Sequence, residues 1–132
     1  MSRLLLDTTF LIDAERFGAE LDTLIDDDDD VAIAAITVAE LRVGALLADA
    51  RRRSTRDAYV NDIIASISIL DYDLKVAEAH ADLLVAVRSQ GKPRGAHDLI
   101  IAATAKAFDR TVLSADGSGF HDLPGIEVRS HR

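Results

Sequence analysis

The sequence predicts an α/β fold, specifically a three-layer α/β/α domain around a central, mostly parallel sheet of about five strands. Short apolar runs recur along the chain, and each is apolar at nearly every position. Longer segments with helical spacing separate these runs. Strands that are apolar on both faces and alternate with helices are typical of parallel sheets that helices cover on both sides.

The first half of the chain is predicted to hold three strands. The run Arg3–Asp7 is the first buried strand, and Val31–Ile36 is the second. A helix is predicted to start between them at Thr8–Asp13. The helical spacing of Leu21, Leu24 and Ile25 extends it to the aspartate run Asp26–Asp30. This run is predicted to end the helix as a solvated loop. Thr37 and Glu40 have the spacing of a capping box. They open a helical region that extends to Ile64, before a third strand at Ile67–Leu70.

The second half is predicted to hold two helices and two further strands. Leu74–Gln90 has one apolar stripe and is an amphipathic helix. The segment Gly91–Gly95 breaks it. Ala96–Phe108 is apolar on almost all sides, which indicates a buried helix. The fourth and fifth strands are predicted at Thr111–Ser114 and Ile126–Arg129.

Length and composition fit a single domain over residues 1-132. The chain is 48% hydrophobic and 29% charged, as in ordinary globular proteins. It has no cysteine, which excludes disulfides, thiolate zinc sites and a cysteine nucleophile. The longest apolar stretch is too short to span a bilayer, and the N-terminus lacks the pattern of a signal peptide. We therefore expect a cytoplasmic protein with no membrane partner.

Four acids lie where such a fold places its ligands. Asp7 ends the first predicted strand, Asp116 follows the fourth, and Glu40 and Asp98 lie in the first turns of helices. A lone carboxylate at the start of a buried helix needs a cation, a hydrogen-bond network or a raised pKa. Oxygen-only ligands suit Mg²⁺ or Mn²⁺ and phosphodiester chemistry. By strand alternation, Thr9 and Ser114 are expected to face the same pocket.

The charge balance alone argues against a nucleic-acid partner. Fifteen Lys and Arg face 23 Asp and Glu, for a net charge of −8. Five of the negative charges lie in the Asp26–Asp30 run, and basic residues cluster in two regions. These clusters weaken that argument, and they consist of Arg42, Arg51, Arg52, Arg53 and Arg56 in one region, and of Arg88, Lys92 and Arg94 in the other.

Four motifs together resemble the PIN-domain ribonucleases, and more closely the VapC-type toxins of bacterial toxin–antitoxin pairs. They are LLLDTTFLID, TVAELRVGA, AHDLIIAATA and TVLSADGSGF, in the family's order along nearly the whole chain. The resemblance implies a PIN fold and an acidic site made of Asp7, Glu40, Asp98 and Asp116, with Thr9 and Ser114 as supporting hydroxyls. One departure is that three residues separate Asp116 from Phe120, one more than the family's common spacing.

What the resemblance implies is metal-dependent cleavage of RNA. Mg²⁺ or Mn²⁺ would be held by Asp7, Asp98, Asp116 and Glu40, and would activate a water that Glu40 orients or deprotonates. The products would carry a 5′-phosphate and a 3′-hydroxyl. The expected partners are an RNA substrate, a cognate VapB-type antitoxin that blocks the acidic site, and a second copy in a homodimer. The RNA would be bound by Arg42 and the Arg51–Arg56 cluster, or by Lys92 and Arg94.

Other interpretations of the same residues stay open at this point. Glu40 can be a capping acid alone, His97 a solvated residue beside Asp98, and Asp13 a helix-start residue. A non-catalytic PIN-like module would bind RNA or protein without turnover. An Asp-based phosphatase would need a second aspartate where this chain has Thr9. The target sequence, the number of metal ions and the role of the Asp26–Asp30 run are not readable from the sequence.

Overall fold

A computed structural model describes residues 1–18, 23–92 and 94–130 of the chain. Five parallel strands form one sheet in the order β3-β2-β1-β4-β5. The elements follow in chain order as β1 (Arg3–Leu6), α1 (Thr8–Phe17), β2 (Asp30–Ala34), α3 (Ala35–Leu47), α4 (Ala50–Ser66), β3 (Ser68–Leu70), α5 (Leu74–Gln90), α6 (Ala96–Ala107), β4 (Thr111–Ser114), the short 3₁₀ turn η1 (Gly117–Gly119) and β5 (Val128–Ser130).

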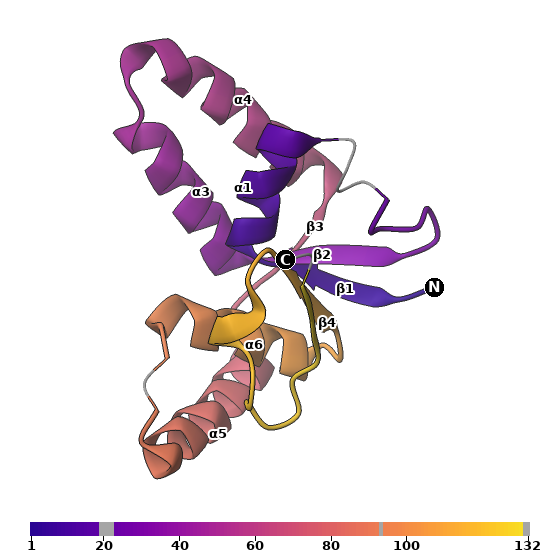
Figure 1. The fold of residues 1–132 in the computed structure, drawn as a ribbon, viewed down its shortest axis with the longest axis vertical. Coiled ribbons are helices and arrows are strands. Elements are labelled where there is room, and N and C mark those ends of the chain that lie inside the picture. The colour runs from indigo at the N-terminus through magenta and orange to yellow at the C-terminus, as the bar shows by residue number, and fades with distance from the viewer. Residues whose placement is uncertain (19–22, 93, 131–132) are drawn as a thin grey trace.

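The strands bury both faces, and alternate residues of β1 divide between two hydrophobic cores. Leu4 and Leu6 pack with α1, α3 and α4 on one face of the sheet. Leu5 packs with α5 and α6 on the other face. Figure 1 shows the two helix groups on opposite sides of the sheet. The predicted three-layer α/β/α architecture is therefore confirmed.

The order of strands reverses at the carboxyl ends of β1 and β4, and we call this place the crevice. The chain runs from β1 outward to β2 and β3, and then crosses back to place β4 on the other side of β1. Ligands of open α/β sheets bind at such a reversal of strand order. The segments that follow β1 and β4, which begin at Asp7 and Ala115, lie beside this point.

The end of the first helix and the start of the second strand differ from their predictions. α1 ends at Phe17, and Leu24 and Ile25 lie in a turn, whereas Leu21 lies outside the described residues. Gly18 ends the helix with a positive φ of 42°, which glycine adopts without steric cost. The Asp26–Asp29 segment is a loop as expected, but Asp30 begins β2.

The region from Thr37 to Ile64 also differs from its prediction. β2 ends at Ala34 and α3 begins at once, so Thr37 lies inside the helix and caps nothing. The predicted capping box is therefore wrong. A break at Ala48 and Asp49 then separates α3 from α4, because the Asp49 side chain accepts the backbone N–H of Arg52 and starts a new helix. In the part of the chain that the structure describes, no helix combines the length and apolarity needed to cross a membrane.

Candidate active site

Asp7 both caps a helix and faces the crevice. It follows β1, and its Oδ1 accepts the backbone N–H of Phe10 at 2.9 Å, as an N-cap residue of α1 does. Its side chain also accepts two hydroxyl hydrogen bonds, from Thr9 at 2.8 Å and from Ser114 at 2.5 Å. The residue is only 3% exposed. A buried carboxylate is thus held in one orientation by three donors from two chain segments.

The two predicted hydroxyls lie against Asp7, although Thr9 arrives there from α1 and not from a strand. The Ser114 Oγ has one proton and two acceptors in reach, Asp7 Oδ2 at 2.5 Å and the Asp116 carbonyl at 2.8 Å. The carboxylate is the shorter and the stronger acceptor. Ser114 then accepts the Asp116 N–H at 3.1 Å. The loop that carries Asp116 is in this way tied to the Asp7 carboxylate.

Burial raises the pKa of Asp7, and the negative charge of Glu40 adds to the effect. The hydrogen bonds from Ser114, Phe10 and Thr9 oppose it, because they stabilise the ionised form. Burial has the larger effect, so this carboxylate carries its charge at a free-energy cost. A cation bound beside it would remove that cost.

Glu40 extends from the second turn of α3 into the same crevice. Its Oε1 accepts the Thr8 hydroxyl at 2.6 Å, and its Oε2 lies 3.3 Å from His97 Nδ1. These contacts connect α3 to α1 and to α6. Glu40 is therefore a positioned acid and not a capping acid. His97, which the sequence suggested was simply solvated, has more than half of its side chain exposed but contacts Glu40.

Asp98 and Asp116 complete the acidic group. Asp98 lies in the first turn of α6. Among the described residues its carboxylate accepts no hydrogen bond and forms no ion pair. Asp116 is exposed, and its Oδ1 accepts the Ser118 N–H at 3.0 Å. A Cβ added to Gly119 would lie 2.4 Å from Asp98 Oδ2, so only glycine permits the turn after Asp116 to approach Asp98 this closely.

Electrostatic repulsion indicates that the four acids are neighbours. Burial raises the pKa of Asp98, and the charges of Asp7, Glu40 and Asp116 raise it further, while His97 opposes them. Four carboxylates from four chain segments offer only oxygen donors, which is the donor set of Mg²⁺ and Mn²⁺. The residues present therefore fit a hard divalent cation.

The four acids form an open group and not a closed cage. Among the described residues, the only three acids whose oxygens all lie within 4.8 Å of one another are Asp26, Asp28 and Asp29, in the loop before β2. Exposed acidic groups of this kind are common without a metal. Around Asp98 the wider spacing leaves room for waters and a phosphate oxygen as further ligands, as Mg²⁺ sites commonly have.

The predicted RNA-contacting residues fall into two sets. Arg42 is bound to Asp57 and Asn61 of α4, Arg53 donates to two carbonyls at the end of α3, and Arg94 donates to the His121 carbonyl at 2.6 Å. These three arginines make contacts within the fold. A second set is exposed or faces pockets, and consists of Arg51, Arg52, Arg56 and Lys92.

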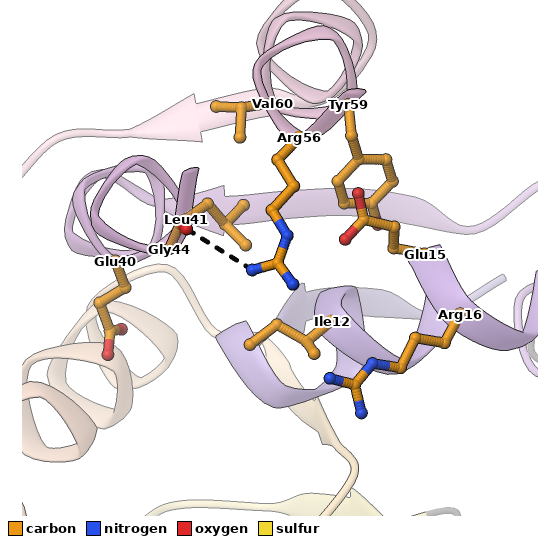
Figure 2. A pocket seen from close by; sticks show the side chains of 9 residues that line it. All are labelled: Ile12, Glu15, Arg16, Glu40, Leu41, Gly44, Arg56, Tyr59 and Val60. Carbon is orange, nitrogen blue, oxygen red and sulfur yellow. Dashed lines mark hydrogen bonds between the residues drawn. The ribbon is translucent and has the colours of Figure 1, made fainter. Parts of the chain in front are cut away.

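Sequence reasoning missed four residues at or near the site. Thr8, His97 and Gly119 contact the acids, and Arg16 lies with Arg56 at a pocket next to Glu40. Figure 2 shows Arg56 extending from α4 into this pocket and Arg16 on α1 at its rim. Thr8 and His97 directly neighbour predicted site residues in the sequence, which was an available signal. Arg16 and Gly119 had none, because their positions depend on how the elements pack. Asp13, considered as a helix-start residue, is instead buried in the middle of α1.

Comparison with known proteins agrees with this fold. The family model described as PIN domain matches residues 4–126. Toxin FitB from Neisseria gonorrhoeae is 38% identical over 110 residues, which cover 80% of this chain and 78% of that protein. The tRNA(fMet)-specific endonuclease VapC from Salmonella typhimurium is 30% identical over 98 residues, covering 74% of this chain and 73% of that protein.

A solved structure has the same fold over nearly the full length. It is described as a member of the VapBC family of toxin-antitoxin systems, VapBC-5, from Mycobacterium tuberculosis. It is 28% identical, has a TM-score of 0.82, and the match covers 98% of this chain and 99% of that chain.

Proposed function

Because the chain belongs to the PIN-domain family, in the branch that contains the VapC toxins, we propose that it is a metal-dependent endoribonuclease of a toxin–antitoxin pair. One observation carries the proposal. Asp7, Glu40, Asp98 and Asp116 come from four separate segments and meet where the strand order reverses. Charges of one sign repel, so bringing them together costs stability. A cluster kept at that cost is typical of a functional site.

The proposed cofactor is Mg²⁺ or Mn²⁺. Asp7, Asp98 and Asp116 would hold it, with Glu40 as a further ligand directly or through water. Such a cation lowers the pKa of bound water and neutralises charge on a phosphate under attack. The hydroxyls of Thr9 and Ser114 donate hydrogen bonds to the Asp7 carboxylate and orient it, in the way that outer-shell partners fix a metal ligand.

In the proposed reaction, Glu40 accepts a proton from the attacking water. Its two oxygens are oriented by Thr8 and His97, and each oxygen keeps a free lone pair for water. Water attacks phosphorus and gives a proton to Glu40 as a new P–O bond forms. The bond to the 3′ oxygen breaks, and that oxygen takes a proton from solvent to become the 3′-hydroxyl. The products carry a 5′-phosphate and a 3′-hydroxyl. The 2′-hydroxyl takes no part as a nucleophile.

The proposed partners follow from the relatives and from the charge of the site. The M. tuberculosis structure is described as part of a toxin-antitoxin system, which supports a VapB-type antitoxin partner for this chain. A segment that carries Arg or Lys would neutralise the crowded carboxylates through charge-assisted hydrogen bonds. We also propose a homodimer and a cytoplasmic location.

The test is a cleavage assay on total RNA and on purified tRNA, with the product ends mapped. Wild type and Asp98→Asn are compared in Mg²⁺, in Mn²⁺ and in EDTA. We expect cuts that need metal, leave 5′-phosphates, and fall by roughly a hundredfold or more in the variant, as expected for loss of a catalytic group. Cleavage that persists in EDTA or in the variant contradicts the proposal.

The same assay separates the remaining alternatives. A binding module would retain RNA in metal without cutting it. A phosphatase would release inorganic phosphate from small phosphate monoesters and leave RNA intact.

A further inference from the structure

We propose that a groove between α1 and the start of α4, lined by Arg16, Arg51, Arg52 and Arg56, binds the phosphate backbone of the RNA on its way to the acids. This inference rests on the proposed nuclease function and adds a substrate-binding surface to it. We call this surface the arginine groove. It includes Arg16, which the sequence did not single out.

The arginine groove is continuous with the acidic site. Its wider part has a volume of about 500 Å³ and is also lined by Glu15 and Thr55. Glu15, Arg16 and Arg56 also line the adjoining pocket of about 140 Å³, and Glu40 lies at the opposite end of that pocket. Figure 2 shows Arg56 between the two helices, with Glu40 beyond Leu41. A strand of RNA can therefore contact the arginines while one phosphate lies at the acids.

The arginines of the groove are available to a ligand. Arg16, Arg51 and Arg52 are exposed, and Arg56 makes only a long contact of 3.5 Å to the Gly44 carbonyl. Among the described residues, none of these four arginines forms an ion pair with a carboxylate. Arg42 of α3, in contrast, pairs with Asp57 of α4. Glu15 is the one acidic side chain among the described residues of the lining.

The position of Arg51 and Arg52 is unfavourable for the helix itself. Both lie in the first turn of α4, where the helix dipole disfavours cations. Local stability therefore does not explain them, and an external anion would. A chain with a net charge of −8 repels RNA over most of its surface, so binding needs a local positive path.

RNA explains the groove better than an acidic peptide does. The groove opens toward a site whose chemistry acts on phosphodiesters, and guanidinium groups bind phosphate oxygens in pairs.

The test measures binding of a fluorescent single-stranded RNA by anisotropy, in Mg²⁺ and in the Asp98→Asn background so that the RNA stays intact. The double variant Arg51→Gln/Arg52→Gln and the single variant Arg16→Gln are compared with Arg88→Gln. Arg88 is an exposed arginine on α5, on the other face of the sheet. Thermal melts show whether each variant is folded.

We expect the RNA affinity of the double variant to fall by about tenfold or more. The slope of log affinity against log salt should become shallower by about 0.7 for each arginine removed. Arg88→Gln should match the background in both. Unchanged affinity and slope in the folded double variant overturn the inference. The inference is also overturned if RNA binding is unchanged while affinity for the antitoxin falls, because the groove is then a protein interface.

Failure of the nuclease proposal gives a different pattern. If wild type cuts no RNA but the double variant still loses RNA binding, the groove stands and the catalytic assignment fails. If wild type cuts RNA and the double variant cuts it with unchanged KM, the groove fails alone.

Discussion

At the scale of single residues, Asp7 combines a structural and a chemical role. The carboxylate that caps α1 is the one that Thr9 and Ser114 orient at the crevice. Because an N-cap is fixed by the start of its helix, the position of Asp7 is set by the same hydrogen bonds that start α1. This part of the site is therefore built into the first strand-to-helix connection.

Asp98 should make the protein less stable at neutral pH when metal is absent. Its folded-state pKa is raised above the ordinary value of 3.8 by burial and by the neighbouring acids. The folded state therefore keeps a proton that the unfolded state has already lost. Stability falls as pH rises from about 3.8 through the folded pKa, and is then flat.

Asp98→Asn is accordingly expected to be more stable than wild type at pH 7 in EDTA, and to show a shallower decline of stability as pH rises. Urea unfolding between about pH 4 and pH 8 measures this. The decline should not vanish, because the pKa of Asp7 is raised as well. Equal or lower stability of the variant at pH 7 would show that the carboxylate is stabilised by a contact absent from this account.

Gly119 should be essential for activity but not for folding. A Cβ at this position would lie 2.4 Å from Asp98 Oδ2, so Gly119→Ala must displace either the acid or the turn after Asp116. We expect a loss of cleavage of at least about tenfold, since small displacements of catalytic groups are costly. Gly95→Ala is the matched control, because its Cβ would lie 3.4 Å from the same oxygen, an ordinary contact. Equal activity of the two variants would contradict the proposed role of this turn.

The four acids could be predicted from the sequence, but their surroundings could not. Asp7 and Asp116 follow apolar runs that had to be strands, and Glu40 and Asp98 lie near the starts of predicted helices. The resemblance to PIN domains then joined the four acids into one site. Thr9 was expected at Asp7 from strand alternation, yet it reaches the carboxylate from the first turn of α1. The contact of His97 with Glu40 depends on how α3 and α6 pack, which no local pattern contains.

At the scale of elements, the predicted boundaries are wrong where two elements meet with no glycine or proline between them. β2 passes directly into α3, so the apolar run Val31–Ile36 contains the end of one and the start of the other. The break between α3 and α4 contains no glycine or proline, and Asp49 alone marks it. The helix Leu74–Gln90 was predicted with both ends correct. In the structure, Asp73 caps its start and Gly91 ends it in a left-handed conformation.

The first turns of α3 contain a buried hydroxyl that should lower stability. Thr37 is fully buried, and its Oγ1 has no hydrogen-bond partner among the described residues. Replacing an unsatisfied buried hydroxyl with a methyl group of the same shape removes a desolvation cost. Thr37→Val should therefore raise the free energy of unfolding by about 1 kcal/mol.

Thr104→Val is the control for this prediction. Thr104 is equally buried, but its hydroxyl donates to the Ile100 carbonyl at 2.8 Å. This variant should be unchanged or lose about 1 kcal/mol. Denaturant unfolding of both variants checks the sign, and destabilisation by Thr37→Val would mean that the hydroxyl has a partner in solution.

At the scale of the whole molecule, the order of strands brings distant segments together. β1 and β4 are neighbours although more than a hundred residues separate Leu5 from its partner Val112. Apolar runs predicted the strands and their burial, but nothing local sets their order in the sheet. The two layers of helices followed from alternation, whereas the crevice required the topology.

The overall account treats the acids at the crevice as one metal site, and a Mn²⁺ titration tests this most directly. Free Mn²⁺ is followed by electron paramagnetic resonance for wild type, Asp98→Asn and Asp28→Asn. Asp28 belongs to the other cluster of acids, in the loop before β2. The account predicts that Asp98→Asn loses the tightest Mn²⁺ site and the cleavage activity together, while Asp28→Asn keeps both. Full Mn²⁺ affinity in Asp98→Asn, or its loss in Asp28→Asn, would contradict the assignment of the metal to the crevice.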